Sequence, residues 1–176
     1  LIQFNSIIED KQISLLTKIN RYPKDYLLSN SRMIPVNKTT FSMTKKEIDQ
    51  ENLKILKILS NRANINILDL AKESSLSINT VKKRMRDLKK KEVILGYRTF
   101  INTEKIGYKY YKLHINLRNY DKNKKQEFLT FLETKPFVIY ISHYINGEDF
   151  EVELHLPSEE EYIKILTEIK QKYGNI

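Results

Sequence analysis

Residues 77–91 concentrate the side chains of this chain that could bind a polyanion. They include seven lysines and arginines against one acidic residue, Asp87, and so carry +6 of the net +9 of the whole chain. Ammonium and guanidinium groups bind phosphate oxygens, and hydroxyl and amide side chains such as those at the start of this stretch hydrogen-bond to base edges. The residue types therefore favour binding to a nucleic acid.

The spacing within residues 77–91 predicts a helix with two different faces. One apolar stripe is formed by Val81, Met85 and Leu88. A polar and cationic face is formed by Asn79, Lys83, Arg86 and Lys90. Ser77 is well placed as the N-cap, and Leu76 can reach Val81 as a hydrophobic staple. Such a helix can pack by its apolar stripe while its other face enters the major groove of double-stranded DNA.

Residues 66–76 are expected to position this basic helix. They predict a shorter helix with apolar Ile67, Leu68, Leu70 and Ala71, which runs into a tight turn at Ser74-Ser75-Leu76. An isolated basic helix is more often a solvated surface than a binding site. The helix-turn-helix spacing is what favours DNA binding here.

The start of the second helix is expected to read base edges through Ser77, Asn79, Thr80 and Lys83. Phosphates would be held by Lys82, Arg86 and Lys90, together with Arg98 from the next segment. Arg84 fits a phosphate contact or a structural role, and Arg98 fits a DNA contact or a solvated strand residue. The chain has no metal-ligand spacing, phosphate loop or nucleophile elbow, so we predict no cofactor, metal or catalytic residue.

The flanking segments complete a winged helix-turn-helix domain over residues 43–102. Thr44 can cap a helix that runs to Leu59, with Glu47 as its capping-box partner. Residues 92–102 are apolar and aromatic around Gly96, which predicts a short β-ribbon, the wing.

Residues 103–176 predict a ferredoxin-like domain. Apolar and polar residues alternate at the start of this segment, which is the pattern of a strand buried on one face. The predicted order of elements is strand, helix, strand, strand, helix. These elements are expected at residues 111–117, 122–134, 137–145, 150–156 and from the N-cap Ser158 onwards. Asn146-Gly147 predicts the hairpin turn between the last two strands. The resulting βαββα(β) unit lacks its fourth strand, and the whole chain is predicted to be α+β.

Residues 1–42 are interpreted as the tail of an earlier ferredoxin-like copy and a linker. At an offset of 150, five of the eleven residues at 9–19 are identical to residues of the last predicted helix, and Ile2 and Phe4 match strand residues before it. Tyr26–Val36 would be the fourth strand of that copy, in a longer tandem protein. The alternative is that Tyr26–Val36 closes the sheet of this same chain.

The charge distribution and the composition limit the classes of function that this chain can have. Residues 43–102 hold 14 lysines and arginines against 7 acidic residues, whereas residues 137–176 hold 3 against 8. One surface is thus suited to phosphates and another is not. No apolar run approaches the ~20 residues that span a bilayer, no signal-peptide pattern opens the chain, and there is no cysteine, so a cytoplasmic protein without a membrane partner is expected.

Several motifs resemble the Lrp/AsnC family of transcription regulators. They are Asp49–Leu59, Leu70-Ala71, Leu76-Ser77, Arg84, Val93–Tyr97 and the connecting segment Ile101–Tyr108. The resemblance implies sequence-specific DNA binding, oligomerisation through the sheet domain, and control by a small molecule such as an amino acid. The 150-residue repeat adds the alternative that the paired copies form an intramolecular pseudo-dimer instead of a homo-oligomer. The chain departs from the family pattern at two turns, where Ser75 and Glu92 replace the usual glycines. Residues 146–150 are also one residue shorter than the effector loop of the family.

Two other functions remain open. Relatives of the family include siroheme decarboxylases, which would require the three histidines of this chain, His114, His143 and His155, to gather around a tetrapyrrole. Each of these residues sits in a strand pattern, where an ordinary structural role is expected. An assembly module that has lost DNA binding is the third class, and the seven cations of residues 77–91 argue against it.

Overall fold

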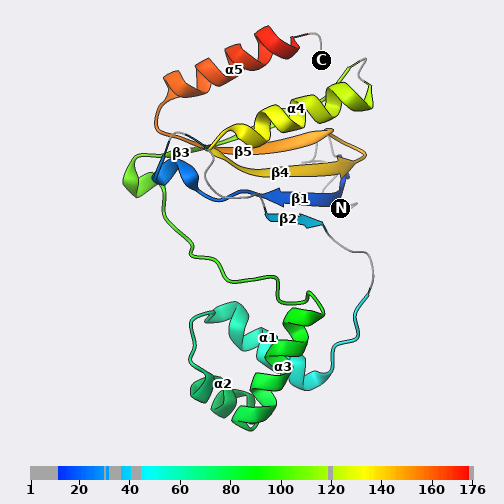
Figure 1. Ribbon diagram of the computed structural model, residues 1–176, viewed down its shortest axis with the longest axis vertical. Helices are drawn as coiled ribbons and strands as arrows, with labels where there is room; N and C mark the ends of the chain where they lie inside the picture. Colours follow the sequence, from blue (N-terminus) through cyan, green and yellow to red (C-terminus); the bar gives the residue numbers. More distant parts are fainter. Residues whose placement is uncertain (1–11, 30, 32–36, 41–44, 119–120, 175–176) are drawn as a thin grey trace, which may run out of the picture. The chain divides into compact units, whose positions relative to one another are not determined.

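The chain forms two compact units in a computed structural model that describes residues 12–29, 31, 37–40, 45–118 and 121–174 (Figure 1). Ser42–Ile101 make a helical unit, and Asn102–Ile176 together with the N-terminal segment make a sheet unit. The helical unit is therefore inserted between two parts of the sheet unit. None of the described helices is long and apolar enough to cross a membrane.

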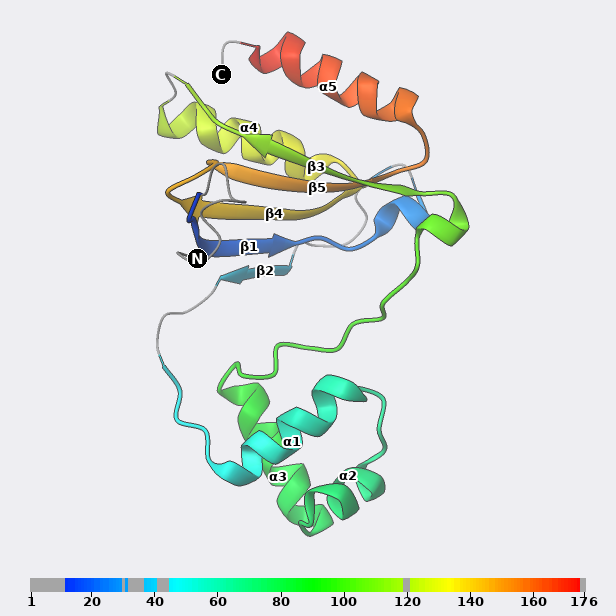
Figure 2. The same cartoon turned by 180° about the vertical axis from the view of Figure 1, so that it is seen from behind.

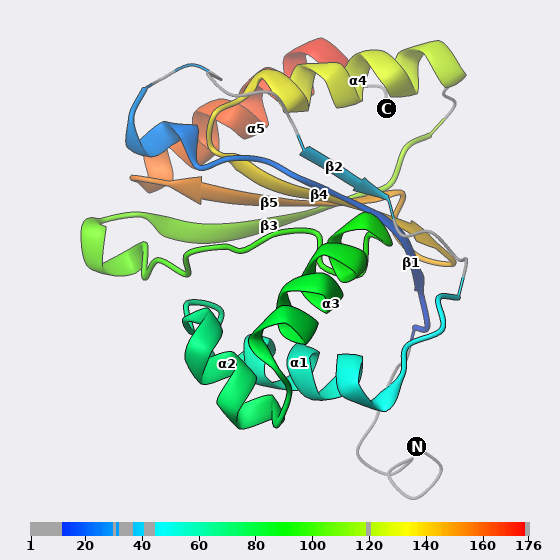
Figure 3. The same ribbon diagram turned by 60° about the horizontal axis from the view of Figure 1, so that its bottom comes forward.

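The helical unit consists of α1 (Gln50–Asn61), α2 (Ile67–Ser74) and α3 (Ile78–Lys90), which Figure 3 shows packed around one another. Each helix begins at a side-chain cap, from Asp49, Asn66 and Ser77 respectively. The buried core joins all three helices through Ile55, Leu59, Leu70, Ala71, Val81 and Leu88. The helix-turn-helix prediction is confirmed.

The start of α1 differs from the sequence prediction. Residues 45–48 are not helical, and the carboxylate of Asp49 caps the helix by accepting a hydrogen bond from the Asn52 amide at 2.8 Å. The predicted cap, Thr44, lies outside the described residues. Aspartate is among the best N-caps, so the helix begins five residues later than predicted, after Asp49.

Two turns adopt the left-handed backbone despite lacking glycine. Ser75 after α2 has φ 60° and ψ 37°, and Glu92 after α3 has φ 57°. At the first turn the Leu76 amide donates to the Ala71 carbonyl at 3.0 Å, which closes the end of α2. The helix-turn-helix geometry is thus kept although the backbone of Ser75 and Glu92 is strained, because a Cβ atom disfavours the left-handed conformation.

The predicted β-ribbon is wrong for the described structure, because residues 95–102 form no strand. The amides of Val93 and Ile94 both donate to the Leu88 carbonyl, at 2.9 and 3.2 Å. Their side chains pack against the three-helix core. The apolar residues Val93 and Ile94, which suggested a ribbon, therefore close the end of α3.

The sheet unit has the predicted strand and helix order. It contains β3 (Lys109–Ile115), α4 (Lys122–Thr134), β4 (Val138–Ile145), β5 (Phe150–Leu156) and α5 (Glu159–Tyr173). Figures 1 and 2 show α4 and α5 on the same face of the sheet. Between helices and sheet lies a core that includes Phe128, Leu132, Ile141, Phe150, Val152 and Leu154. The hairpin turn is confirmed at Asn146, whose φ is 59°.

The N-terminal segment extends this same sheet. Strands β1 (Leu15–Arg21) and β2 (Asn37–Thr40) give the antiparallel order β2-β1-β4-β5-β3, and a 3-10 helix, η2 (Asp25–Leu27), lies between them in sequence. A helix continuing through Ile19, as the repeat suggested, is wrong. The segment does join the sheet of this chain, but through residues 15–21 and 37–40, since Tyr26 is in η2 and residues 32–36 lie outside the described part.

Strand pairing explains why β1 is not helical. β4 would otherwise present an open edge of backbone amides and carbonyls, and β1 pairs with it from Leu15↔Ile145 to Arg21↔Tyr140. The side chain of Tyr22, just after β1, is fully buried in the core of the sheet unit. The similarity to the last helix shows only an amphipathic pattern, and an earlier copy in a longer protein stays a prediction.

Candidate nucleic-acid interface

Two of the predicted base-reading side chains cap α3 instead of projecting freely. The Ser77 hydroxyl accepts a hydrogen bond from the Thr80 amide at 3.1 Å. The Ser77 and Thr80 hydroxyls also lie 2.8 Å apart and hydrogen-bond to each other. Their polar groups are thus engaged in starting the helix, and a DNA contact would have to share or replace these bonds.

The remaining predicted residues of α3 are exposed, whereas Val81 and Leu88 are buried in the core. These exposed residues are Asn79, Lys82, Lys83, Arg86 and Lys90. Within the described part of the chain, none of the five has a hydrogen-bond or ion-pair partner. The helix therefore offers one amide and four cations to a ligand, and no internal bond has to break first.

Arg84 has a different role from the other cations of α3. Its Nη1 lies 2.6 Å from Asp49 Oδ2, and its Nη2 pairs with Glu51 Oε2. The Asn52 amide and Arg84 hold the pKa of Asp49 below its usual range, and the two carboxylates raise the pKa of Arg84. Arg84 thus ties α3 to the start of α1, which is the structural role of the two that the sequence left open.

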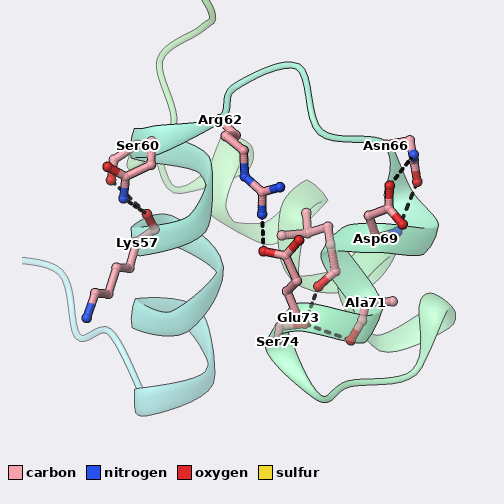
Figure 4. Close-up of polar contacts among 10 residues, drawn as sticks. Lys57, Ser60, Arg62, Asn66, Asp69, Ala71, Glu73 and Ser74 are labelled. Carbon is pink, nitrogen blue, oxygen red and sulfur yellow. Dashed lines mark hydrogen bonds and ion pairs between the residues drawn. The ribbon is translucent and has the colours of Figure 1, made fainter.

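Polar contacts also set α2 against α1 (Figure 4). Arg62, at the end of α1, pairs with Glu73 of α2, and the Asn66 amide donates to the Asp69 carboxylate at 2.6 Å. The buried Ser74 hydroxyl donates to the Leu70 carbonyl at 2.6 Å, just before the left-handed Ser75. The Arg62–Glu73 pair joins α1 to α2, and the other two bonds stabilise the start and the end of α2 before the turn into α3.

Arg98 lacks the ribbon that was expected to present it. The residue is exposed in the strandless stretch after α3. Next to it, the Tyr97 ring lies 5.5 Å from Lys89 Nζ. The structure therefore groups seven of the eight predicted site residues on α3 or its cap and leaves Arg98 outside this helix.

One exposed apolar residue of α3 was missed by the sequence analysis. Ile78, the first helical residue, is 38% exposed and is absent from the apolar cluster that joins the three helices. The signal in the sequence was an isoleucine that falls outside the Val81, Met85 and Leu88 stripe.

The three histidines do not gather around a common site. His114 lies 2.8 Å from a carboxylate oxygen of Glu148, and the His143 ring contacts the Phe150 ring edge-on. His155 is buried, and its Nδ1 lies 2.5 Å from the Tyr26 hydroxyl. Burial, with Lys24 adding a second effect, lowers the pKa of His155 to about 4. Each imidazole thus has its own structural partner, and the described residues include no group of three potential metal ligands.

Comparison with known proteins matches the helical unit to DNA-binding proteins. A family profile described as winged helix-turn-helix DNA-binding matches residues 49–94. The HTH-type transcriptional regulator LrpA of Pyrococcus horikoshii is 39% identical over 61 residues, which are 35% of this chain and 43% of that protein. The match spans less than half the length of this curated relative.

Solved structures match over more of the chain. An AsnC family transcriptional regulator from Agrobacterium tumefaciens superposes with a TM-score of 0.63 and 20% identity, covering 71% of this chain and 82% of that one. LrpC of B. subtilis gives 0.61 and 16%, covering 72% and 89%. The feast or famine regulatory protein from M. tuberculosis, complexed with L-methionine, gives 0.60 and 20%, covering 71% and 84%.

The profile matches the helical unit alone, whereas the structural likeness covers most of the chain at low sequence identity and concerns the fold. The helical unit is thus similar to winged helix-turn-helix DNA-binding domains, and the fold of most of the chain is similar to that of solved AsnC- and Lrp-type regulators.

Proposed function

We propose that this protein is a transcription regulator that binds specific sequences of double-stranded DNA through α3. The observation that carries this proposal is the exposed face of α3, on which Asn79, Lys82, Lys83, Arg86 and Lys90 have no partner within the described residues. Cations without internal ion pairs can bind phosphates directly, and an unbonded amide suits the edge of adenine.

The phosphate part of the proposal is tested by replacing Lys82, Lys83 and Arg86 with alanine in the full chain. Affinity for duplex DNA should fall, and the slope of log affinity against log salt should decrease by ~0.9 for each phosphate that the variant no longer binds. Fluorescence anisotropy across a salt series measures both quantities.

The matched control removes three exposed cations from the sheet unit, Lys122, Lys124 and Lys170, and changes the net charge equally. It should keep most of the wild-type slope. Arg84→Gln is expected to keep the slope as well, because its guanidinium already binds Asp49 and Glu51. An unchanged slope in a folded Lys82/Lys83/Arg86 variant would exclude α3 as the phosphate-binding helix.

Sequence specificity is tested at Asn79. An asparagine that bonds both N6 and N7 of adenine contributes about 1–3 kcal/mol of discrimination at one base pair. Selection from random duplexes should therefore enrich a site whose preference at one position disappears in Asn79→Ala. If the variant has the same reduction in affinity on every sequence, Asn79 contacts the backbone and does not read a base.

Control by a small molecule is part of the same proposal. A protein of the same fold has been solved with L-methionine, and we extend to this chain the expectation of an amino-acid effector. The turn at Asn146-Gly147 is the segment in question, although it is one residue shorter than the family pattern. Titration of the common amino acids into the protein–DNA complex tests this, and an affinity for DNA that no amino acid changes would remove the effector from the proposal.

A further inference from the structure

The first turn of α3 contains an apolar side chain that stays partly exposed, Ile78. Ile78 is 38% exposed, although it stands between Leu76 and Val81, which both belong to the apolar cluster of the helical unit. Ile78 itself does not belong to this apolar cluster. The exposed positions that follow it on α3 carry mainly amide and cationic groups, so this isoleucine stands out by its chemistry.

The hydrogen bonds of the same turn decide which side chains a ligand would meet there. The hydroxyls of Ser77 and Thr80 bond to each other, and Ser77 also caps the helix. Ile78 and Asn79 are the neighbours left without such a bond in this part of the described chain. An apolar group and an amide therefore occupy the first two positions of α3, at the end of the helix that, in helix-turn-helix proteins, approaches the bases.

An exposed isoleucine is stabilised when it moves from water onto an apolar surface. In the major groove the apolar group is the C5-methyl of thymine, which stands beside the acceptor O4. The adenine of the same or an adjacent base pair presents the donor and acceptor that an asparagine can bond. The pair Ile78 and Asn79 thus matches the chemistry of an A·T-containing step.

We propose that Ile78 contacts a thymine methyl group and determines a preference for thymine at one position of the DNA site. This inference rests on the proposed DNA-binding function and makes Ile78 a specificity-determining residue. It differs from the contacts expected of the lysines and arginines, because a methyl contact discriminates between bases and depends little on salt.

Replacing thymine by deoxyuridine tests the contact, because uracil lacks only the 5-methyl group and keeps the hydrogen-bonding edge. In the site enriched by the wild-type chain, each thymine is replaced in turn and the affinity measured. One position should weaken binding about fourfold, which corresponds to the ~0.8 kcal/mol of one buried methyl-sized group.

Variants of Ile78 are then combined with the thymine-to-deoxyuridine replacement in a double-mutant cycle. Ile78→Ala should bind the thymine site more weakly than the wild type and should no longer distinguish thymine from deoxyuridine at that position. Ile78→Val keeps a branched side chain and should retain part of the discrimination. Leu53→Ala is the matched control, since Leu53 on α1 is 47% exposed and also lies outside the apolar cluster. It should leave the thymine-to-deoxyuridine ratio unchanged.

The possible failures are distinct. If the wild-type chain binds no DNA, the proposed function fails and Ile78 with it. If it binds a specific site but no deoxyuridine substitution weakens binding, the methyl contact is wrong and the function stands. Full discrimination retained by Ile78→Ala, with its fold verified by circular dichroism, would assign the methyl contact to another residue.

Discussion

At the scale of single residues, Ser75 and Glu92 hold the turns after α2 and α3 without glycine. Both have positive φ angles of 60° and 57°, in the region where a Cβ atom meets the neighbouring carbonyl oxygen. A glycine at either position would remove that repulsion. The turns are retained because the core contacts of the helices on either side determine where the chain must go.

Ser75→Gly and Glu92→Gly are therefore expected to stabilise the protein. Relief of the left-handed strain should raise the free energy of unfolding by about 0.5–1 kcal/mol at each position, after part of the gain is offset by the greater freedom of glycine in the unfolded chain. Urea denaturation of the full chain measures this. Lys72→Gly, inside α2, is the control and should lower stability by about 1 kcal/mol. Equal destabilisation at all three positions would contradict the strain.

At the scale of elements, the N-terminal segment is attached to the sheet by more than strand pairing. Tyr26 of η2 bonds to His155 of β5, and its carbonyl accepts a hydrogen bond from the Tyr108 hydroxyl at 3.3 Å. The Tyr26 and Tyr108 rings are 4.6 Å apart. Burial raises the pKa of Tyr26 to about 12, so its hydroxyl stays protonated beside the neutral imidazole. This cluster holds η2 against the start of β3 and the end of β5.

Stability should depend on pH because His155 is held neutral in the folded state. Its pKa is about 4 when folded against an ordinary value of 6.5, so the unfolded chain binds a proton that the folded chain does not. The contribution of His155 is complete above pH 6.5 and declines as the pH falls towards 4. Thermal unfolding across this range should therefore show a slope that His155→Gln reduces. His114→Gln removes an exposed histidine and should keep that slope; a profile identical in both variants would contradict the assignment.

At the scale of the whole molecule, the helical unit is an insertion. The chain leaves the sheet after β2 and returns to it at β3, and these are the two edge strands in the order β2-β1-β4-β5-β3. The helical unit is therefore connected to the sheet unit at both of its ends. The helices α4 and α5 cover one face of the sheet, as Figure 2 shows. Tyr111 stacks on Tyr162 of α5, so its neighbours Tyr110 and Lys112 point to the other face.

That other face suits pairing with a second copy. Tyr110, Lys112 and His114 of β3 are exposed there, and Lys112 and His114 oppose Glu153 and Glu151 of β5, which gives this surface an aromatic group and charges of both signs. We expect the chain to self-associate through it at tens of micromolar in light scattering. Tyr110→Arg should weaken the association, whereas Ile163→Arg, on the exposed side of α5, should not. A strictly monomeric wild-type protein would argue against pairing through the sheet.

Local patterns were sufficient for most elements. The cap and apolar stripe of α3, the helix at 122–134 and the strands and turn of 137–156 were predicted close to their observed bounds. Each of these has a period, a cap or a turn residue that acts within a few residues of sequence. The cations of α3 could be predicted for the same reason, since their exposure follows from the helical period.

Tertiary structure alone decided the remaining features. Leu15–Arg21 has a pattern that fits a helix or a strand, and the open edge of β4, about 125 residues away, makes it a strand. Val93 and Ile94 fitted the pattern of a β-ribbon, but in the structure they pack against the core of α1 to α3. Arg84 could have faced DNA until Asp49 and Glu51 were placed beside it. In each case the stability of the observed conformation depends on contacts with residues distant in sequence, and a local sequence pattern holds no information about those contacts.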